Sequence, residues 1–275
     1  MTDAAQSFLT DADRALAERF LANGFVVVEA EDRSALDRIR ALAAELAAKY
    51  LKSPTPDDVS HFLDRIHEKV DAAQLNDLRL TVIGGLNAAA WLRPAYYGLA
   101  RSALAAICGN ELAMQRRLNL SIQLPGDESS LLPVHADVWA GDSPFEVVLW
   151  VPLVDCHDTK SMFLLPPEPD HAARARWDEL GGKSTEDLFQ AIEADLEWLS
   201  VPYGKVVVFS QTLMHGNRVN REKDSRWSMN CRFKGVFSPY GDKKLGEFFE
   251  PITLRAASRM GLDYEFPGGG LKAVS

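Results

Sequence analysis

Two side chains of the kinds that bind metals, His135 and Asp137, are separated by a single residue. We expect residues Pro133–Val138 to form a strand, on which residues two apart project from the same face. A third ligand from another strand would complete a set of two histidines and one carboxylate, which binds non-haem iron(II) and leaves three positions open. His215 is the best third ligand, because it follows an apolar strand predicted at Val206–Phe209. The sequence therefore predicts a metal site at His135, Asp137 and His215.

The segment that follows His215 strengthens this hypothesis. From residue 226 to residue 233, polar residues alternate with apolar ones, as on a strand with one polar and one apolar face. The polar face could be an ordinary solvent-exposed surface, or it could line a cavity. In the second case Arg226 could hold a carboxylate through paired hydrogen bonds, with Ser228 assisting. Arg226 and Arg232 are roughly 20 Å apart on an extended chain, so they cannot both bind one small dicarboxylate. We expect Arg226 in this role, because it starts the strand, at the metal end.

The remaining histidines are poorer candidates for metal ligands. An isolated His-x-Asp pair is weak evidence, since it arises often by chance. His61, His67 and His171 fall in charged helical stretches, where we expect them to be solvated. His157 falls in what we interpret as a turn after a strand.

The first 109 residues have the patterns of a mainly helical scaffold that contains one strand. Gly24 favours a helix end, and the β-branched run that follows it favours a strand. Periodic leucine and alanine indicate further helices, with breaks at prolines. The expected elements are helices at Asp11–Asn23, Ser34–Leu51, Asp57–Ala73 and Ala88–Cys108, the last interrupted near Pro94, and a strand at Phe25–Glu29.

After Gly109 the chain changes to short strand patterns separated by turn residues, which is typical of a sandwich or barrel. A charged stretch at about residues 171–199 has a helical pattern and is predicted to be an insert. The expected strands are Leu118–Leu124, Pro133–Val138, Glu146–Val154, Ser161–Leu165, Val206–Phe209 and Arg226–Phe237.

Composition excludes several classes of protein. The net charge of −9 argues against broad nucleic-acid binding, which requires a basic surface. No apolar run approaches the roughly 20 residues that span a bilayer, so no membrane partner is expected. The N-terminus lacks the pattern of a secretory signal. The three cysteines form no paired motif, and we interpret them as reduced thiols of a cytoplasmic protein.

The order of these motifs resembles the phytanoyl-CoA-dioxygenase-type 2-oxoglutarate oxygenases. The order is His-x-Asp, an insert, the segment Met214-His215-Gly216-Asn217, and Arg-x-Ser 11 residues after His215. The strands expected around Val148–Asp155 and Met162–Pro167 are similar to strands of that family, and Gly24–Val28 is similar to its opening strand. Within the family, the chain most resembles oxygenases found among bacterial carbohydrate-biosynthesis genes.

This resemblance implies an α+β, mainly β fold, in which N-terminal helices flank a double-stranded β-helix (a jelly roll, cupin-like). We expect one domain over residues 1–275, made of a helical scaffold (1–109), a core (110–240) with the insert, and a C-terminal extension (241–275). The resemblance implies iron(II) on His135, Asp137 and His215, with dioxygen and 2-oxoglutarate as co-substrates. It also implies that Arg226 pairs with the distal carboxylate of 2-oxoglutarate, supported by Ser228.

Gln123 is a further candidate for the co-substrate site, because it lies on an alternating segment, Asn119–Gln123, whose polar side could face the same cavity. The presence of Asp137 favours hydroxylation or a related oxidation, because halogenases of this superfamily lack the metal-binding carboxylate.

The expected substrate is a small molecule, and five arginines near the site in sequence would suit a phosphorylated or nucleotide-linked sugar. For any single one of them, a solvated surface charge is the better interpretation. Two other functions stay open: a cupin-like, metal-dependent sugar isomerase or epimerase, and a non-catalytic jelly-roll binding module. The oligomeric state cannot be read from the sequence. The five residues are Arg116, Arg117, Arg218, Arg221 and Arg232.

Overall fold

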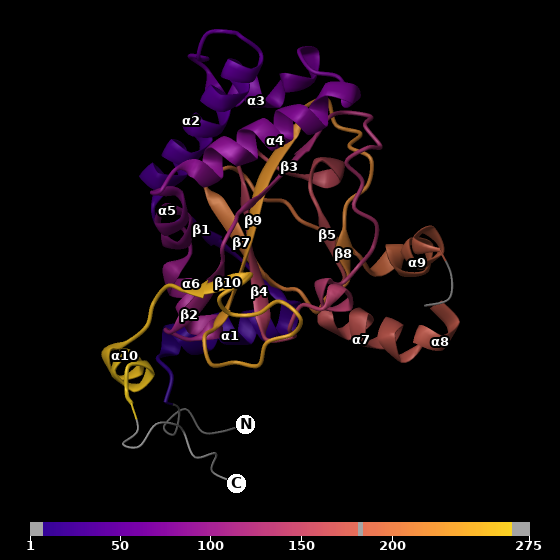
Figure 1. Ribbon diagram of the computed structural model, residues 1–275. Helices are drawn as coiled ribbons and strands as arrows, with labels where there is room; N and C mark the ends of the chain where they lie inside the picture. The colour runs from indigo at the N-terminus through magenta and orange to yellow at the C-terminus, as the bar shows by residue number, and fades with distance from the viewer. Residues whose placement is uncertain (1–7, 181–183, 266–275) are drawn as a thin grey trace.

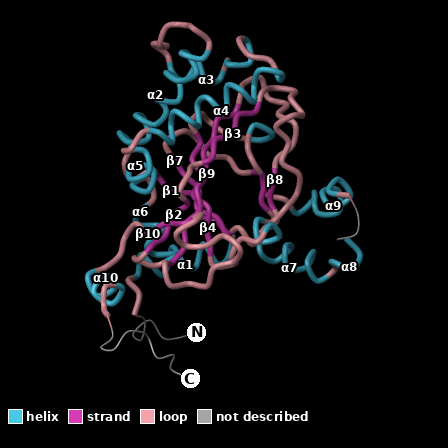
Figure 2. Tube along the Cα trace, in the orientation of Figure 1, coloured by secondary structure: helices cyan, strands magenta, loops and turns pink. Residues whose placement is uncertain are grey.

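Antiparallel strands form two sheets that lie apart from each other (Figures 1 and 2). A cavity is lined by residues of both sheets. The computed structural model describes residues 8–180 and 184–265, so part of the predicted insert and the end of the predicted C-terminal extension lie outside the described residues. The larger sheet has the order β1-β7-β4-β9-β2-β10, and β3 pairs with β9. Its strands are β1 (Phe25–Glu29), β2 (Leu112–Gln115), β3 (Asn119–Gln123), β4 (Glu146–Pro152), β7 (Lys205–Ser210), β9 (Arg226–Gly235) and β10 (Phe249–Pro251). The smaller sheet contains β5 (Phe163–Leu164), β6 (Glu197–Trp198) and β8 (His215–Gly216).

Helices from the first third of the chain cover the outer face of the larger sheet (Figure 1). The helices are α1 (Asp11–Asn23), α2 (Arg33–Tyr50), α3 (Val59–Asp64), α4 (Ala72–Ala88), α5 (Leu92–Gly98), α6 (Arg101–Cys108), α7 (Pro167–Ala175), α8 (Trp177–Leu180), α9 (Thr185–Ile192) and α10 (Ala256–Leu262). Single 3-10 turns are η2 (Ile66–Glu68), η3 (Asp137–Ala140), η4 (Asp158–Lys160) and η5 (Glu193–Asp195). The α+β jelly-roll prediction is confirmed, although helix outweighs strand in the chain as a whole.

Local capping explains where the first helix ends and the first strand begins. The Thr10 side chain accepts a hydrogen bond from the Asp13 N–H (3.1 Å) at the start of α1. Gly24 ends the helix with a φ of 74°, a left-handed conformation that glycine adopts without strain. A Cβ at Gly24 would also lie 2.2 Å from Leu213 Cδ1, so a side chain here would have to displace that of Leu213. The chain therefore turns sharply into β1, as predicted.

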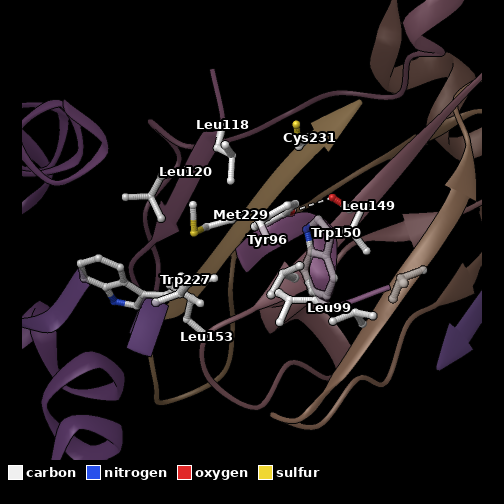
Figure 3. Close-up of a cluster of buried hydrophobic side chains, with 14 of the residues drawn as sticks. Tyr96, Leu99, Leu118, Leu120, Leu149, Trp150, Leu153, Trp227, Met229 and Cys231 are labelled. Atoms are coloured by element: carbon white, nitrogen blue, oxygen red, sulfur yellow. Dashed lines mark hydrogen bonds between the residues drawn. The ribbon is translucent and has the colours of Figure 1, made fainter. Parts of the chain in front are cut away.

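Strand β9 separates the hydrophobic core from the cavity. Trp227, Met229, Cys231 and Phe233 are fully buried on the helical side of the sheet, whereas the alternate residues face the cavity. Figure 3 shows this core, in which the Tyr96 hydroxyl donates a hydrogen bond to the Leu149 carbonyl (2.8 Å). The two-faced strand predicted from the alternation is confirmed, and its polar face lines a cavity rather than the outer surface.

Some predicted boundaries were wrong. The helix predicted at Asp57–Ala73 stops at Asp64, and the longer helix α4 begins after Asp71, which caps it. Pro94 does not interrupt a helix. It is the third residue of α5, within the first turn, where no backbone N–H is needed.

The charged insert forms α7, α8, α9 and β6 and packs through a separate apolar cluster against the smaller sheet (Figure 1). Phe163 of β5 contacts Phe189 of α9 and Trp198 of β6 in this cluster. The predicted division of the chain at residues 109 and 240 remains a prediction.

Candidate active site

The two candidate histidine ligands come together where the segment 132–135 runs beside β8. His135 and His215 form an antiparallel bridge, in which each backbone N–H donates to the other residue's carbonyl (3.0 and 2.8 Å). Their ring centroids are 4.3 Å apart. Gly216 permits this close approach, since a Cβ there would lie 2.6 Å from the Leu132 carbonyl oxygen. Residues 80 positions apart in the chain therefore present their imidazoles side by side.

Backbone carbonyls orient both rings. His135 Nδ1 lies 2.8 Å from the Pro133 carbonyl oxygen, and His215 Nδ1 lies 2.9 Å from that of Leu213. Because a carbonyl can only accept a hydrogen bond, each Nδ1 carries a proton in this arrangement. In its neutral form, each ring then offers the lone pair of Nε2, which is the state that binds a metal ion.

Asp137 completes the cluster, but not from a strand. It opens the 3-10 turn η3, so the predicted strand at Pro133–Val138 was wrong: an isolated bridge at His135 is followed by a turn. Asp137 Oδ1 nevertheless lies 3.6 Å from His135 Nε2. The ligand atoms of His135, Asp137 and His215 lie within 4.8 Å of one another, a grouping that could hold one metal ion.

The protonation states of the three groups suit a metal ion. Burial, together with the neighbouring His135, lowers the pKa of His215 to about 4, so this ring is neutral at pH 7. Burial alone would raise the pKa of Asp137, but the neighbouring His135 ring, 3.6 Å away, and the charge of Arg232 outweigh burial and hold this pKa below its usual value. Burial likewise lowers the pKa of His135, while Asp137 raises it more, for a net rise. The cluster offers one carboxylate and imidazole nitrogens, the donor set of a facial iron(II) site.

A cavity of about 300 Å³ extends from this cluster along β9. Its apolar wall includes Trp150, Met162 and Phe209. The polar residues of the lining are Asn119, Ser121, Arg226, Ser228, Asn230 and Arg232.

Arg226 is buried in this cavity with hydrogen-bonding capacity to spare. Its Nη1 donates to the Ser161 carbonyl (2.8 Å), and its Nη2 donates to Ser121 Oγ (2.9 Å). Within the described part of the chain, Arg226 Nε and Ser228 Oγ have no hydrogen-bond partner. Burial lowers the pKa of Arg226 to about 10, which still leaves it charged at pH 7. A buried cation with unused donors fits a carboxylate, which takes paired hydrogen bonds from arginine.

Two expectations about this region need correction. Arg226 is not the arginine beside the metal ligands: Arg232 is, with Nη2 3.0 Å from Asp137 Oδ1, because η3 lies over the later part of β9. Gln123 pairs with Arg226 in register but does not line the cavity, and its side-chain amide donates to the Arg218 carbonyl (2.6 Å).

The other arginines fall in two places. Arg116 and Arg117 line a groove that adjoins the cavity at Asn119. Arg218 and Arg221 line a different pocket beside the insert, where Arg218 pairs with Glu186.

The structure also adds residues that the sequence analysis missed. Ser121 and the Ser161 carbonyl hold Arg226, and Asp142 and Gln211 contact Arg232. Only the alternation through Asn119–Gln123 hinted at Ser121. His157, with Asp158 and Glu222, forms a second, more exposed group of ligand-type residues.

Two histidines and one carboxylate with open positions are the ligand set of non-haem iron(II) oxygenases. A sequence profile of the phytanoyl-CoA dioxygenase (PhyH) family matches residues 20–228, and the chain belongs to this family. It is accordingly an iron(II)- and 2-oxoglutarate-dependent oxygenase that acts on a small molecule with dioxygen. The predicted family, activity and cofactors are thus confirmed. No curated protein matches the chain significantly in sequence.

Solved structures share the fold at low identity. A non-haem monooxygenase, the ThoJ–nickel complex, has a TM-score of 0.53 at 19% identity and covers 82% of this chain and 79% of its own. EctD from S. alaskensis in its apo form has a TM-score of 0.54 at 17% identity, covering 85% and 81%. HygX from Streptomyces hygroscopicus with nickel and 2-oxoglutarate bound has a TM-score of 0.50 at 14% identity, covering 86% and 90%.

No helix in residues 8–180 and 184–265 is long and apolar enough to cross a membrane.

Proposed function

We propose that His135, Asp137 and His215 hold the iron(II), and that Arg226 with Ser228 binds the distal carboxylate of 2-oxoglutarate. The observation that carries this assignment is that one cavity contains both the three ligand groups and a buried arginine with unused donors. When bound, the iron supplies oxidation coupled to decarboxylation of 2-oxoglutarate to succinate. The chain supplies orientation: carbonyls fix both imidazoles, and Ser121 and Ser161 fix the guanidinium.

We further propose that the substrate is a small polar molecule with an anionic group, of the phosphorylated or nucleotide-linked sugar type. A groove of about 550 Å³ adjoins the cavity and is lined by Arg79, Arg116 and Arg117. Asn119 lines both spaces and donates to Asn230 (2.9 Å) inside the cavity. Glu247 also lines the groove, and Arg116 lies 3.5 Å from Glu250. On a chain with a net charge of −9, the excess of arginine in this groove is a local attraction for an anion.

In this arrangement the anionic group would lie in the groove while the rest of the molecule reaches past Asn119 toward the metal ligands. Hydroxylation is the expected outcome, since the carboxylate of Asp137 is present. A cytoplasmic location agrees with the free thiols: burial raises the pKa of Cys156 and of Cys231 to about 12, so both are protonated at pH 7.

A screen for substrate-stimulated succinate release tests the proposal. Purified protein with iron(II), 2-oxoglutarate and oxygen would be given phosphorylated, nucleotide-linked and neutral sugars. We expect stimulation by the anionic sugars, and a higher KM for them in an Arg116→Glu, Arg117→Glu variant whose basal succinate release is unchanged.

Each other outcome refutes a defined part of the proposal. Equal stimulation by neutral sugars would show that the groove does not select an anionic substrate. Turnover without 2-oxoglutarate would indicate an isomerase or epimerase, and failure to bind stoichiometric iron would indicate a binding module.

A further inference from the structure

Arg232 is a charged side chain that contacts the proposed metal ligand Asp137, and neither metal binding nor co-substrate binding accounts for it. Its Nη2 lies 3.0 Å from Asp137 Oδ1, and both side chains are largely buried. Placing a cation against a ligand carboxylate competes with the metal ion for the same negative charge. Such a contact persists only where the surrounding structure holds it.

Buried partners hold the Arg232 guanidinium in one place. Its Nε lies 3.1 Å from Gln211 Oε1 and 3.3 Å from Asp142 Oδ1. Asp142 and Gln211 are themselves buried, and Asp142 forms an ion pair with Lys243. Because both partners of Nε are held in place, the guanidinium keeps one orientation, in which Nη2 contacts Asp137 Oδ1.

Gln211 is fixed from the other side as well. Its amide nitrogen donates to the Ser143 carbonyl (3.1 Å) and to Glu146 Oε2 (2.7 Å). The guanidinium therefore rests on residues from the loop before β4 and the turn after β7, which do not reach the metal site themselves.

We infer that Arg232 is a positioning residue that makes Asp137 offer the metal ion one carboxylate oxygen rather than both. This inference rests on the ligand assignment proposed above. An octahedral ion has six positions, of which two histidines and one oxygen take three. A co-substrate that takes two more leaves one position for dioxygen. If Asp137 bound through both of its oxygens, that last position would be lost.

The inference predicts a defect at the open position, separate from metal and co-substrate binding. Nitric oxide binds iron(II) at the position open to dioxygen, and the complex can be followed by electron paramagnetic resonance without turnover. In the anaerobic protein with iron(II) and 2-oxoglutarate, Arg232→Gln should weaken nitric oxide binding by about tenfold or more, the scale of losing one charge-assisted hydrogen bond. The affinity for 2-oxoglutarate should change by less than about twofold, because Arg226 remains. The affinity for nickel(II) should not fall, because the three ligands remain and a cation that competes for the Asp137 carboxylate is removed.

A second variant and a matched control complete the test. Arg232→Lys keeps the charge but loses the planar fork, so it should show the same defect, and it carries the test if Arg232→Gln fails to fold. Arg221→Gln, an exposed arginine outside the cavity, should behave as the wild type.

Wild-type nitric oxide binding in both Arg232 variants would overturn the inference. A selective loss of 2-oxoglutarate affinity in them would also overturn it, by making Arg232 a co-substrate anchor. If the wild-type protein itself fails to bind nickel(II) and 2-oxoglutarate together, the ligand assignment fails instead, which separates the two hypotheses.

Discussion

Replacing Arg226 by lysine tests the co-substrate anchor while preserving its charge. Arg226 is 3% exposed and spends one donor each on the Ser161 carbonyl and on Ser121 Oγ. A guanidinium has five N–H groups, so three of them remain for a bound carboxylate, including Nε, which has no partner within the described residues. Lysine offers a point charge without the planar fork, so it can no longer form two parallel bonds to one carboxylate.

The size of the effect follows from the lost bond. A hydrogen bond to a charged group contributes about 1.5–3 kcal/mol, and about 1.4 kcal/mol changes a dissociation constant tenfold. Loss of one of the two parallel bonds should therefore raise the Kd for 2-oxoglutarate by about 10- to 150-fold. The affinity for the metal ion should stay unchanged, because Arg226 contacts none of the proposed ligands.

Calorimetric titration of 2-oxoglutarate into nickel(II)-loaded protein measures this Kd without turnover. A titration of nickel(II) into the metal-free variant provides the second quantity. Arg221→Lys is the matched control and should leave both values unchanged. An unaltered Kd for 2-oxoglutarate in Arg226→Lys would refute the reasoning, as would a loss of 2-oxoglutarate affinity in Arg232→Lys in its place.

The remaining predictions concern the metal ligands and the core. Asp137→Ala should lower nickel(II) affinity by more than about 100-fold. This loss is larger than the roughly 10- to 100-fold loss that follows when a residue hydrogen-bonded to a metal ligand is replaced. His157→Ala, from the second, exposed cluster, should not lower that affinity, and an equal loss in both variants would disprove the assignment. His215→Ala should abolish 2-oxoglutarate-dependent succinate release even in excess iron(II), and residual wild-type activity would exclude His215 as a ligand. Tyr96→Phe should lower the free energy of unfolding by about 1–3 kcal/mol, because the buried Leu149 carbonyl loses its side-chain donor. Urea denaturation measures that change, and an unchanged midpoint would contradict it.

Local patterns in the sequence were sufficient for much of the fold. Gly24 marks the end of α1 through a backbone conformation that involves only near neighbours. The alternation from Arg226 to Phe233 separates the two faces of β9 because successive side chains on any strand point to opposite sides. Such features do not depend on the rest of the chain, and they were predicted correctly.

The types of residue at the candidate site were also readable, but their arrangement was not. The sequence pointed to His135, Asp137 and His215 through residue chemistry and family resemblance. It could not show that Asp137 opens a 3-10 turn, because that conformation depends on how the segment 132–140 packs against β8 and β9.

Which arginine meets which partner was likewise decided by tertiary structure alone. Arg226 and Arg232 have the same side chain on the same face of one strand, so no local pattern distinguishes their surroundings. Arg226 donates a hydrogen bond to Ser121, which lies 105 residues earlier in the chain on another strand. Arg232 forms an ion pair with Asp137, which lies on a separate turn. The pairing of β3 with β9 and the path of η3 over the cavity assign one arginine to the proposed co-substrate end and the other to the proposed metal end. Both depend on contacts between segments far apart in the chain, which periodicity within a single strand does not encode.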